Sequence, residues 1–165
     1  MQPCASLIES YSSQNLYQID CLKIFFLILQ VTHFLQCGQM KSVESTLKNL
    51  QNYLTILAQR LENQQEQRIV LSSSPIVNFY WMHMDHLGML VFLLTIIHAI
   101  QTGSLEKAQK LIDKALANLQ KLKTKELDKQ NRLPLMFHNS TFVTNKLHIM
   151  ILENQIRCSI AMGNR

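Results

Sequence analysis

The histidines and the carboxylate around position 85 are the residues whose types and spacing come nearest to a chemical site. His83, Asp85 and His86 carry ligand atoms that Zn²⁺ and similar ions accept. On a helix, however, a step of three residues brings only two imidazoles to one face, and no third ligand stands nearby in the sequence. We therefore expect no metal site here.

The sequence also lacks the motifs of nucleophilic catalysis and of phosphate binding. The cysteines lack the paired spacing of a metal or redox motif, so we expect buried free thiols in a reducing compartment. They are Cys4, Cys21, Cys37 and Cys158. The chain has no Gly-rich loop before a helix, no Gly-x-Ser-x-Gly turn and no close pair of carboxylates in apolar surroundings. The sequence therefore predicts a protein that is not an enzyme and uses no cofactor or small-molecule substrate.

Lysines supply one candidate binding surface. They recur at helical steps on the face opposite an apolar stripe, at Lys107, Lys110, Lys114, Lys121 and Lys125. A solvated helix face is the ordinary explanation of this spacing. The functional alternative is a basic face for DNA or an acidic partner, in keeping with a net charge of +5, and its affinity would fall with salt. No base-reading element accompanies the lysines, so sequence-specific binding is not predicted.

The elements that position these residues are predicted to be helices. Hydrophobic residues make up 47% of the chain, and only 4 Gly and 3 Pro are available for turns. Strands are hard to place among so few turn signals. No Gly/Ser linker or charge block divides the sequence, so we expect one all-α array over residues 1–165.

Gly103 marks the clearest turn between two helices. Apolar or small residues stand at matched distances on both sides of it. They are Phe92, Ile96 and Ala99 before the turn and Ala108, Ile112 and Ala115 after it. Small residues at these positions let two antiparallel helices approach closely, as in a tetratricopeptide hairpin.

Two weaker copies of this pattern surround Gly38 and Gly163. The first has Leu27, Val31 and Phe34 before Gly38 and Val43, Leu47 and Leu50 after it; the second has Leu152, Ile156 and Ser159 before Gly163. The glycines lie much farther apart than the roughly 34 residues of the standard repeat. Long second helices are therefore expected, the first from Met40 to about Gln67.

These copies predict a tetratricopeptide-like superhelical solenoid of antiparallel helix pairs. The units cover about 21–67 and 79–127, with a third from about 141 that stops in mid-repeat. Helix starts are predicted at Asp20, Asn78, Ser104 and Asn139 or Ser140, because such side chains cap free amide groups. A solenoid normally needs three or more units, so the 165 residues are expected to be a piece of a longer protein.

Two apolar runs are candidates for membrane-spanning helices. They extend from Leu22 to Leu35 and from Leu87 to Ile100, and each is interrupted by His or Gln. Both are shorter than the roughly 20 residues needed to cross a bilayer. An inner helix of a solenoid is apolar nearly all round, which explains the runs better, so no membrane partner is predicted.

Residues Phe79 to Lys123 carry a resemblance to a known family. The matching features are Trp81, the run Leu90 to His98, the block Gln101-x-Gly103-x-Leu105-Glu106-Lys107-Ala108-Gln109-Lys110, and the motifs Asp113-Lys114-Ala115-Leu116 and Leu119-x-Lys121-Leu122-Lys123. Any tetratricopeptide repeat shares the small-residue positions, but not the Lys and Gln identities between them. The segment resembles the MAU chromatid cohesion factor family, the tetratricopeptide subunit of the cohesin loader.

The resemblance implies a function that spacing alone does not supply. Members of that family form a superhelix around the extended amino-terminal segment of a large partner, the Nipped-B type loader protein. The pair places cohesin on chromatin in the nucleus and maintains sister-chromatid cohesion. Family members are several times longer, so this chain would supply an internal part of the channel.

Within such a superhelix the inner groove is lined mainly by first helices. This selects Phe25, Ile28, Thr32, Leu35 and Gln36 in the first unit and Leu90, Leu93, Ile97, Ile100 and Gln101 in the second. We expect these mostly apolar residues to bury side chains of a threaded partner peptide. The alternative is that neighbouring repeats cover them.

Two other functions remain open from the sequence. The apolar spacing from Met40 to Leu61 also fits a heptad seam, which would make the protein a helical-bundle or coiled-coil oligomer. The preceding helix is apolar around most of its circumference, whereas a two-stranded coiled coil buries only one seam of each helix. This argues against a two-stranded coil. The lysine face would instead make the protein a basic helical module that binds nucleic acid.

Overall fold

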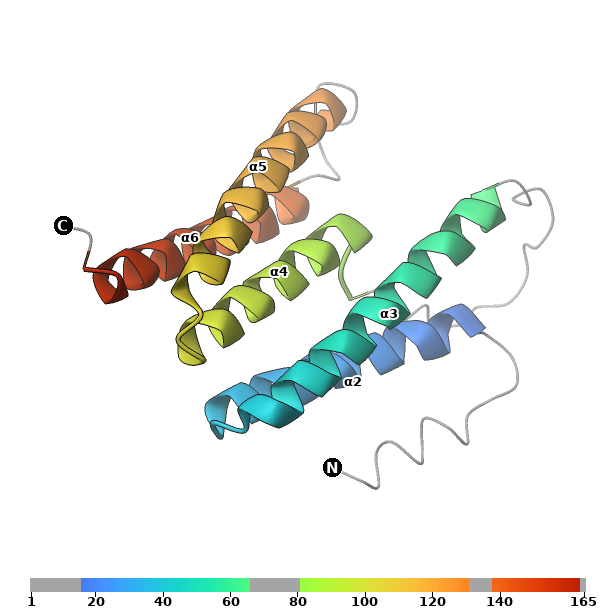
Figure 1. Cartoon of the computed structure of the whole chain (residues 1–165). Helices are drawn as coiled ribbons and strands as arrows, with labels where there is room; N and C mark the ends of the chain where they lie inside the picture. The colour runs from blue at the N-terminus through green and yellow to red at the C-terminus, as the bar shows by residue number, and fades with distance from the viewer. Residues whose placement is uncertain (1–15, 66–80, 131–137, 164–165) are drawn as a thin grey trace. The chain divides into compact units, whose positions relative to one another are not determined.

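The computed structural model describes residues 16–65, 81–130 and 138–163, and over these ranges the chain is helical without strands (Figure 1). The helices are α2 (Leu16–Gln36), α3 (Met40–Gln65), α4 (Met84–Gln101), α5 (Leu105–Gln130) and α6 (His138–Ala161). The predicted all-α class is confirmed for these residues. The long second helices are also confirmed, since α3 reaches Gln65 and α5 reaches Gln130.

The chain divides into two compact units, Met1–His83 and Met84–Arg165. In the first unit α2 packs along α3, and in the second unit α4, α5 and α6 all pack against one another. Each unit has its own buried residues. The prediction that both belong to one continuous array stays a prediction.

The first unit is a helix hairpin held together by aliphatic side chains. From α2 it buries Ile24, Ile28, Val31 and Leu35, and from α3 it buries Val43, Leu47, Leu50 and Leu57. These residues recur at steps of three, four or seven positions, so each helix presents one apolar stripe to the other. Burial of these stripes from water is the main force that holds the pair together.

The second unit has a three-helix core built around α5. Its members come from α4 (Met89, Leu93, Ile96, Ala99), α5 (Ala108, Ile112, Ala115, Leu119, Leu122) and α6 (Leu147, Ile151, Cys158). Ala108 and Ala115 are fully buried, and their small side chains let the backbone of α5 approach its neighbours closely. The stripe predicted on α5 therefore lies in the core of this unit.

The turns at Gly38 and Gly103 have the same conformation. Their φ angles are 71° and 75°, in the left-handed region that favours glycine. The amide of the next residue donates back into the preceding helix, from Gln39 to the carbonyl of Phe34 and from Ser104 to that of Ala99, each at 2.9 Å. Both glycines thus end one helix and start the next.

Two glycine-to-alanine substitutions are expected to shift stability in opposite directions. Gly103→Ala places a Cβ at positive φ and should destabilise the second unit by roughly 1–2 kcal/mol. Gly88→Ala, in the body of α4 with open space for a Cβ, should stabilise it by about 0.5–1 kcal/mol. Amide hydrogen exchange of α4 and α5 measures both effects. Equal effects of the same sign would contradict the role given to Gly103.

Two predicted helix starts, at Asp20 and at Asn139 or Ser140, differ from the structure. The first helix begins at Leu16, because no helix breaker separates Leu16 from Asp20. Asp20 therefore lies inside α2, where its side chain is only 7% exposed. Asn78 lies outside the described residues, and α4 begins only at Met84. The last helix begins at His138, where the hydroxyl of Ser140 donates to Glu126. At Ser104 the prediction is confirmed, since α5 begins at the next residue.

Two helical windows, Ile19–Gln36 and Met84–Gln101, are long and apolar enough to cross a membrane by length and composition alone. The core helix of a soluble protein passes the same test. Of these windows 33% and 44% of the residues are buried inside the protein. In α4 the buried residues include Leu93 and Ile96, which lie in the core that α4 shares with α5 and α6. The absence of a membrane partner stays a prediction.

Candidate functional site

The predicted groove residues of the first unit divide into supporting and accessible side chains. Ile28 and Leu35 are only 6% and 7% exposed, so they lie in the core of the hairpin. Phe25 and Thr32 are partly buried, and Gln36 is exposed at the end of α2. Phe25, Thr32 and Gln36 are therefore the members of this predicted set that stay at least partly accessible to solvent.

Trp81 lies against one of these residues, Phe25. Its ring meets that of Phe25 edge to face, with 5.1 Å between ring centroids and 70° between ring planes. The indole Nε1 is buried and finds no acceptor in the part of the chain that the structure describes. Because this nitrogen is itself buried, the observation concerns the packing of the first unit around Trp81.

In the second unit the predicted groove residues follow one face of α4. Leu93 is 1% exposed and belongs to the core, so its side chain is closed to a partner. Leu90, Ile97 and Ile100 are partly buried against that core, and Gln101 is exposed. These four residues form what we call the α4 face. It combines fixed apolar side chains with one amide able to bond a peptide backbone.

The basic face of α5 is open to solvent. All five of its predicted members, Lys107, Lys110, Lys114, Lys121 and Lys125, are exposed. Their spacing places them along one side of the helix. The neighbouring Lys123 is partly buried and donates from Nζ to Nδ1 of His148 on α6 at 2.9 Å.

The histidine considered for metal binding lies in a buried polar network. Oε1 of Glu126 accepts from Ser140 Oγ at 2.6 Å and from Thr144 Oγ1 at 2.8 Å, and it lies 3.3 Å from Nε2 of His86. The same Nε2 is 2.8 Å from Thr144 Oγ1. Because Thr144 donates its one hydroxyl hydrogen to Glu126, its oxygen accepts from His86, and Nε2 is assigned a hydrogen.

This network leaves Nε2 of His86 without a lone pair for a metal ion in the arrangement observed. Its Nε2 is a donor to Thr144, whereas a metal ligand needs a free lone pair. Within the ranges that the structure describes, no three His, Cys, Asp or Glu residues gather to hold a metal ion. The network instead links α4, α5 and α6 of the second unit.

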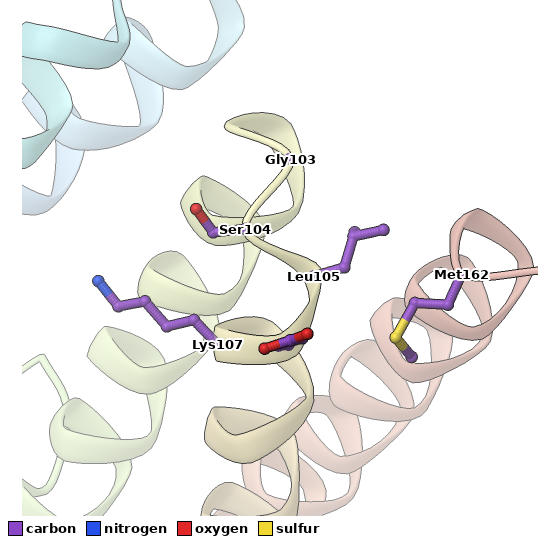
Figure 2. A pocket seen from close by; sticks show the side chains of 6 residues that line it. Gly103, Ser104, Leu105, Lys107 and Met162 are labelled. Carbon is purple, nitrogen blue, oxygen red and sulfur yellow. The ribbon is translucent and has the colours of Figure 1, made fainter.

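An open recess of about 690 Å³ lies where α5 begins and α6 ends (Figure 2). It is lined by Gly103, Ser104, Leu105, Glu106, Lys107 and Met162. Leu105 projects toward Met162 across the recess, and the thiol of Cys158 contacts the Leu105 carbonyl at 3.5 Å. Its lining combines the apolar Leu105 and Met162 with the charged Glu106 and Lys107.

The whole chain, residues 1–165, matches the profile of the cohesin loading factor family. The chain belongs to this family. It is 36% identical to the MAU2 chromatid cohesion factor homolog of Aedes aegypti, 34% to that of Drosophila virilis and 35% to that of Drosophila willistoni, each over 92% of this chain. The matched segment is only 20–22% of the length of these relatives. No solved structure gives a significant match.

Membership of the cohesin loading factor family agrees with the resemblance seen in the sequence, and the structure adds residues that the sequence analysis missed. Glu126 and Thr144 were not recognised, although both stand on apolar stripes. Glu126 follows Leu122 by four positions, and Thr144 precedes Leu147 by three. A polar residue in register with a buried stripe was the available signal for a buried network.

The prediction that the cysteines of this protein are buried is confirmed for two of the three that the structure describes. Cys21 and Cys158 are buried free thiols, whereas Cys37 is exposed, which corrects the prediction. The reason is its place after the last turn of α2, next to the Gly38 turn. There its sulfur lies 3.7 Å from Nε2 of His33. Cys4 lies outside the described residues.

The contact between Lys123 and His148 gives a testable pH dependence. Burial, and next the charge of Lys123, lower the pKa of His148 from the ordinary 6.5. As pH falls below 6.5, the unfolded chain takes up the proton first, so stability falls until pH passes the lowered pKa of the folded state. His148→Gln should remove this slope, which urea unfolding across pH 5–7.5 can measure. An unchanged slope in the variant would contradict the assignment.

Proposed function

We propose that this chain is part of a non-enzymatic scaffold subunit of the cohesin loading complex. It binds an extended segment of the large, Nipped-B type loader subunit and supports cohesin loading on chromatin and sister-chromatid cohesion in the nucleus. Membership of the cohesin loading factor family supports this proposal, as does the likeness to relatives named chromatid cohesion factor homologs.

The proposed architecture is a tetratricopeptide-like superhelix. Two hairpins with the same turn at Gly38 and Gly103 support it, because repeated turns with repeated packing positions generate a solenoid. The coiled-coil alternative gains less support. The seam residues Leu47, Leu50 and Leu57 of α3 are already buried against other residues of their own unit.

The α4 face is the observation that carries the partner proposal. Leu90, Ile97 and Ile100 are held in place by the core beneath them, so little side-chain entropy is lost when a peptide covers them. The apolar side chains of the peptide then leave water, and Gln101 bonds its backbone. A long contact area offsets the cost of ordering an extended segment.

The proposal predicts that truncating the α4 face weakens partner binding without unfolding the unit. The double variant Ile97→Thr/Ile100→Thr should weaken binding of the amino-terminal segment of a Nipped-B type protein about tenfold, since each change removes roughly 0.8 kcal/mol of apolar burial. Fluorescence anisotropy of a labelled segment measures the affinity. Leu93→Asp is unsuitable, because Leu93 lies in the core.

The matched control for this variant is Ile56→Thr on α3. Ile56 is 42% exposed and is not among the predicted groove residues. It should leave the affinity unchanged. Equal affinities of the native chain and the α4-face variant, with circular dichroism showing both folded, would overturn the assignment of this face.

A second function is favoured by the five exposed lysines of α5. We propose that the basic face makes salt-dependent contacts with DNA or an acidic segment alongside the scaffold role. Replacing Lys107, Lys114 and Lys121 with Gln should reduce the salt slope of affinity for random duplex DNA by up to about 3, one for each phosphate that is no longer neutralised. A slope that stays the same would dismiss this function.

A further inference from the structure

An exposed thiol and an imidazole lie in contact at the turn that joins α2 to α3 (Figure 1). Sγ of Cys37 is 3.7 Å from Nε2 of His33 and 4.0 Å from its Nδ1. Both side chains are exposed, whereas Cys21 and Cys158 are buried. Of the cysteines that the structure describes, Cys37 is therefore the one that a dissolved reagent reaches without any opening of the fold.

The backbone fixes the thiol and the imidazole one helical turn apart. The amide of Cys37 donates to the carbonyl of His33 at 2.9 Å, so helical hydrogen bonding continues as far as Cys37. The glycine turn that follows is closed by the amide of Gln39, which donates to the carbonyl of Phe34 at 2.9 Å. Side chains four residues apart on a helix share one face, so the contact between thiol and imidazole follows from the local fold.

A thiol beside an imidazole is a nucleophile beside a base. The thiolate is the reactive form of cysteine, and an imidazole in contact with the thiol can accept its proton. In the tautomer with its hydrogen on Nδ1, Nε2 of His33 has the lone pair that this transfer needs. His33 also lies in the last turn of α2, where the free carbonyl groups of the helix end stabilise a positively charged imidazolium.

We infer that Cys37, activated by His33, is a modification site for small soluble disulfides such as glutathione disulfide. Nε2 of His33 takes the thiol proton, and the Cys37 thiolate attacks one sulfur of the disulfide. A new S–S bond forms to Cys37 while the S–S bond of the reagent breaks. The leaving thiolate takes the proton from His33, so the products are a mixed disulfide and one free thiol.

Two further properties of the protein agree with this reaction. Its net charge of +5 favours the approach of an anionic reagent such as glutathione disulfide. The mixed disulfide forms at an exposed turn and is reversed by a thiol reductant through the same exchange. The inference concerns the chemistry of one side chain and does not depend on the proposed partner.

The test follows mixed-disulfide formation with glutathione disulfide at pH 7 by peptide mass spectrometry. The chain carries Cys4→Ser, which removes the cysteine that lies outside the described residues. Thr55→Cys on α3 supplies a reference thiol at an exposed position with no histidine or lysine one turn away. Cys37 should react at least fivefold faster than the thiol at position 55 and at least tenfold faster than the buried Cys21 and Cys158.

His33→Gln separates activation by the imidazole from exposure alone. This variant should slow the reaction at Cys37 at least threefold, because the thiol stays exposed but loses its base. The rate at position 55 and the circular dichroism spectrum should stay the same, which shows that the hairpin is intact. A ratio below fivefold between Cys37 and position 55 would overturn the inference, and so would a slowing by His33→Gln of less than threefold.

Discussion

Ile112→Ala is expected to destabilise the second unit by about 2–5 kcal/mol. Ile112 is fully buried at the centre of a core to which α4, α5 and α6 all contribute. The change removes apolar atoms from this core and leaves a cavity that the surrounding helices fill only in part. Amide hydrogen exchange in α5 measures the effect, since these amides report the opening of this unit.

A change of the same chemistry on the same helix provides the control. Leu127 is 59% exposed, so Leu127→Ala should alter the exchange free energy by no more than about 0.5 kcal/mol. Equal effects of the two variants would mean that α5 is not packed as described. The hairpin account of the fold would then be wrong.

Glu126→Ala is expected to cost the second unit about 3 kcal/mol. Glu126 is 7% exposed, and its Oε1 accepts hydrogen bonds from the hydroxyls of Ser140 and Thr144. Without the carboxylate, the hydroxyls of Ser140 and Thr144 lose their acceptor, and each buried unsatisfied group costs roughly 1–3 kcal/mol. Urea unfolding followed by circular dichroism measures the loss.

Two further variants make the network prediction specific. Glu126→Gln keeps an acceptor oxygen and should cost less than Glu126→Ala, whereas Gln120→Ala on an exposed part of α5 should cost little. A loss as small for Glu126→Ala as for Gln120→Ala would show that the network does not hold α4, α5 and α6 together.

The turns and helix contacts were predictable because they depend on local spacing. Gly103 stands between two apolar stripes of period 3.6, and the left-handed turn there reverses the chain so that the stripes face each other. The same rule found Gly38 and Gly163. Helix starts were less predictable, as Asp20 shows, because a residue that caps a helix is also tolerated inside one.

The sequence did not allow us to predict which groove residues are accessible. A helix apolar nearly all round has no polar face that tells its core side from its binding side. Leu93 was therefore grouped with Leu90 and Ile97, although Leu93 points into the core and the others are only partly buried. Which side is buried depends on α6, whose sequence lies more than forty residues away.

The buried network was missed for a related reason. His86 drew attention through its neighbours His83 and Asp85, which suggested metal chemistry within a few residues of chain. Its observed contacts, Thr144 and Glu126, come from other helices. Long-range polar contacts of this kind become visible only when the helices are packed.

The most direct test of the account measures binding of this chain to the amino-terminal segment of a Nipped-B type protein. We expect saturable binding of one segment to one chain, weakened about tenfold by Ile97→Thr/Ile100→Thr and absent with a scrambled segment of the same composition. The same titration with a full-length relative, such as the Aedes aegypti protein, is expected to give tighter binding because more of the groove is present. No binding to the full-length relative would contradict the claim that this fold is a scaffold for an extended partner.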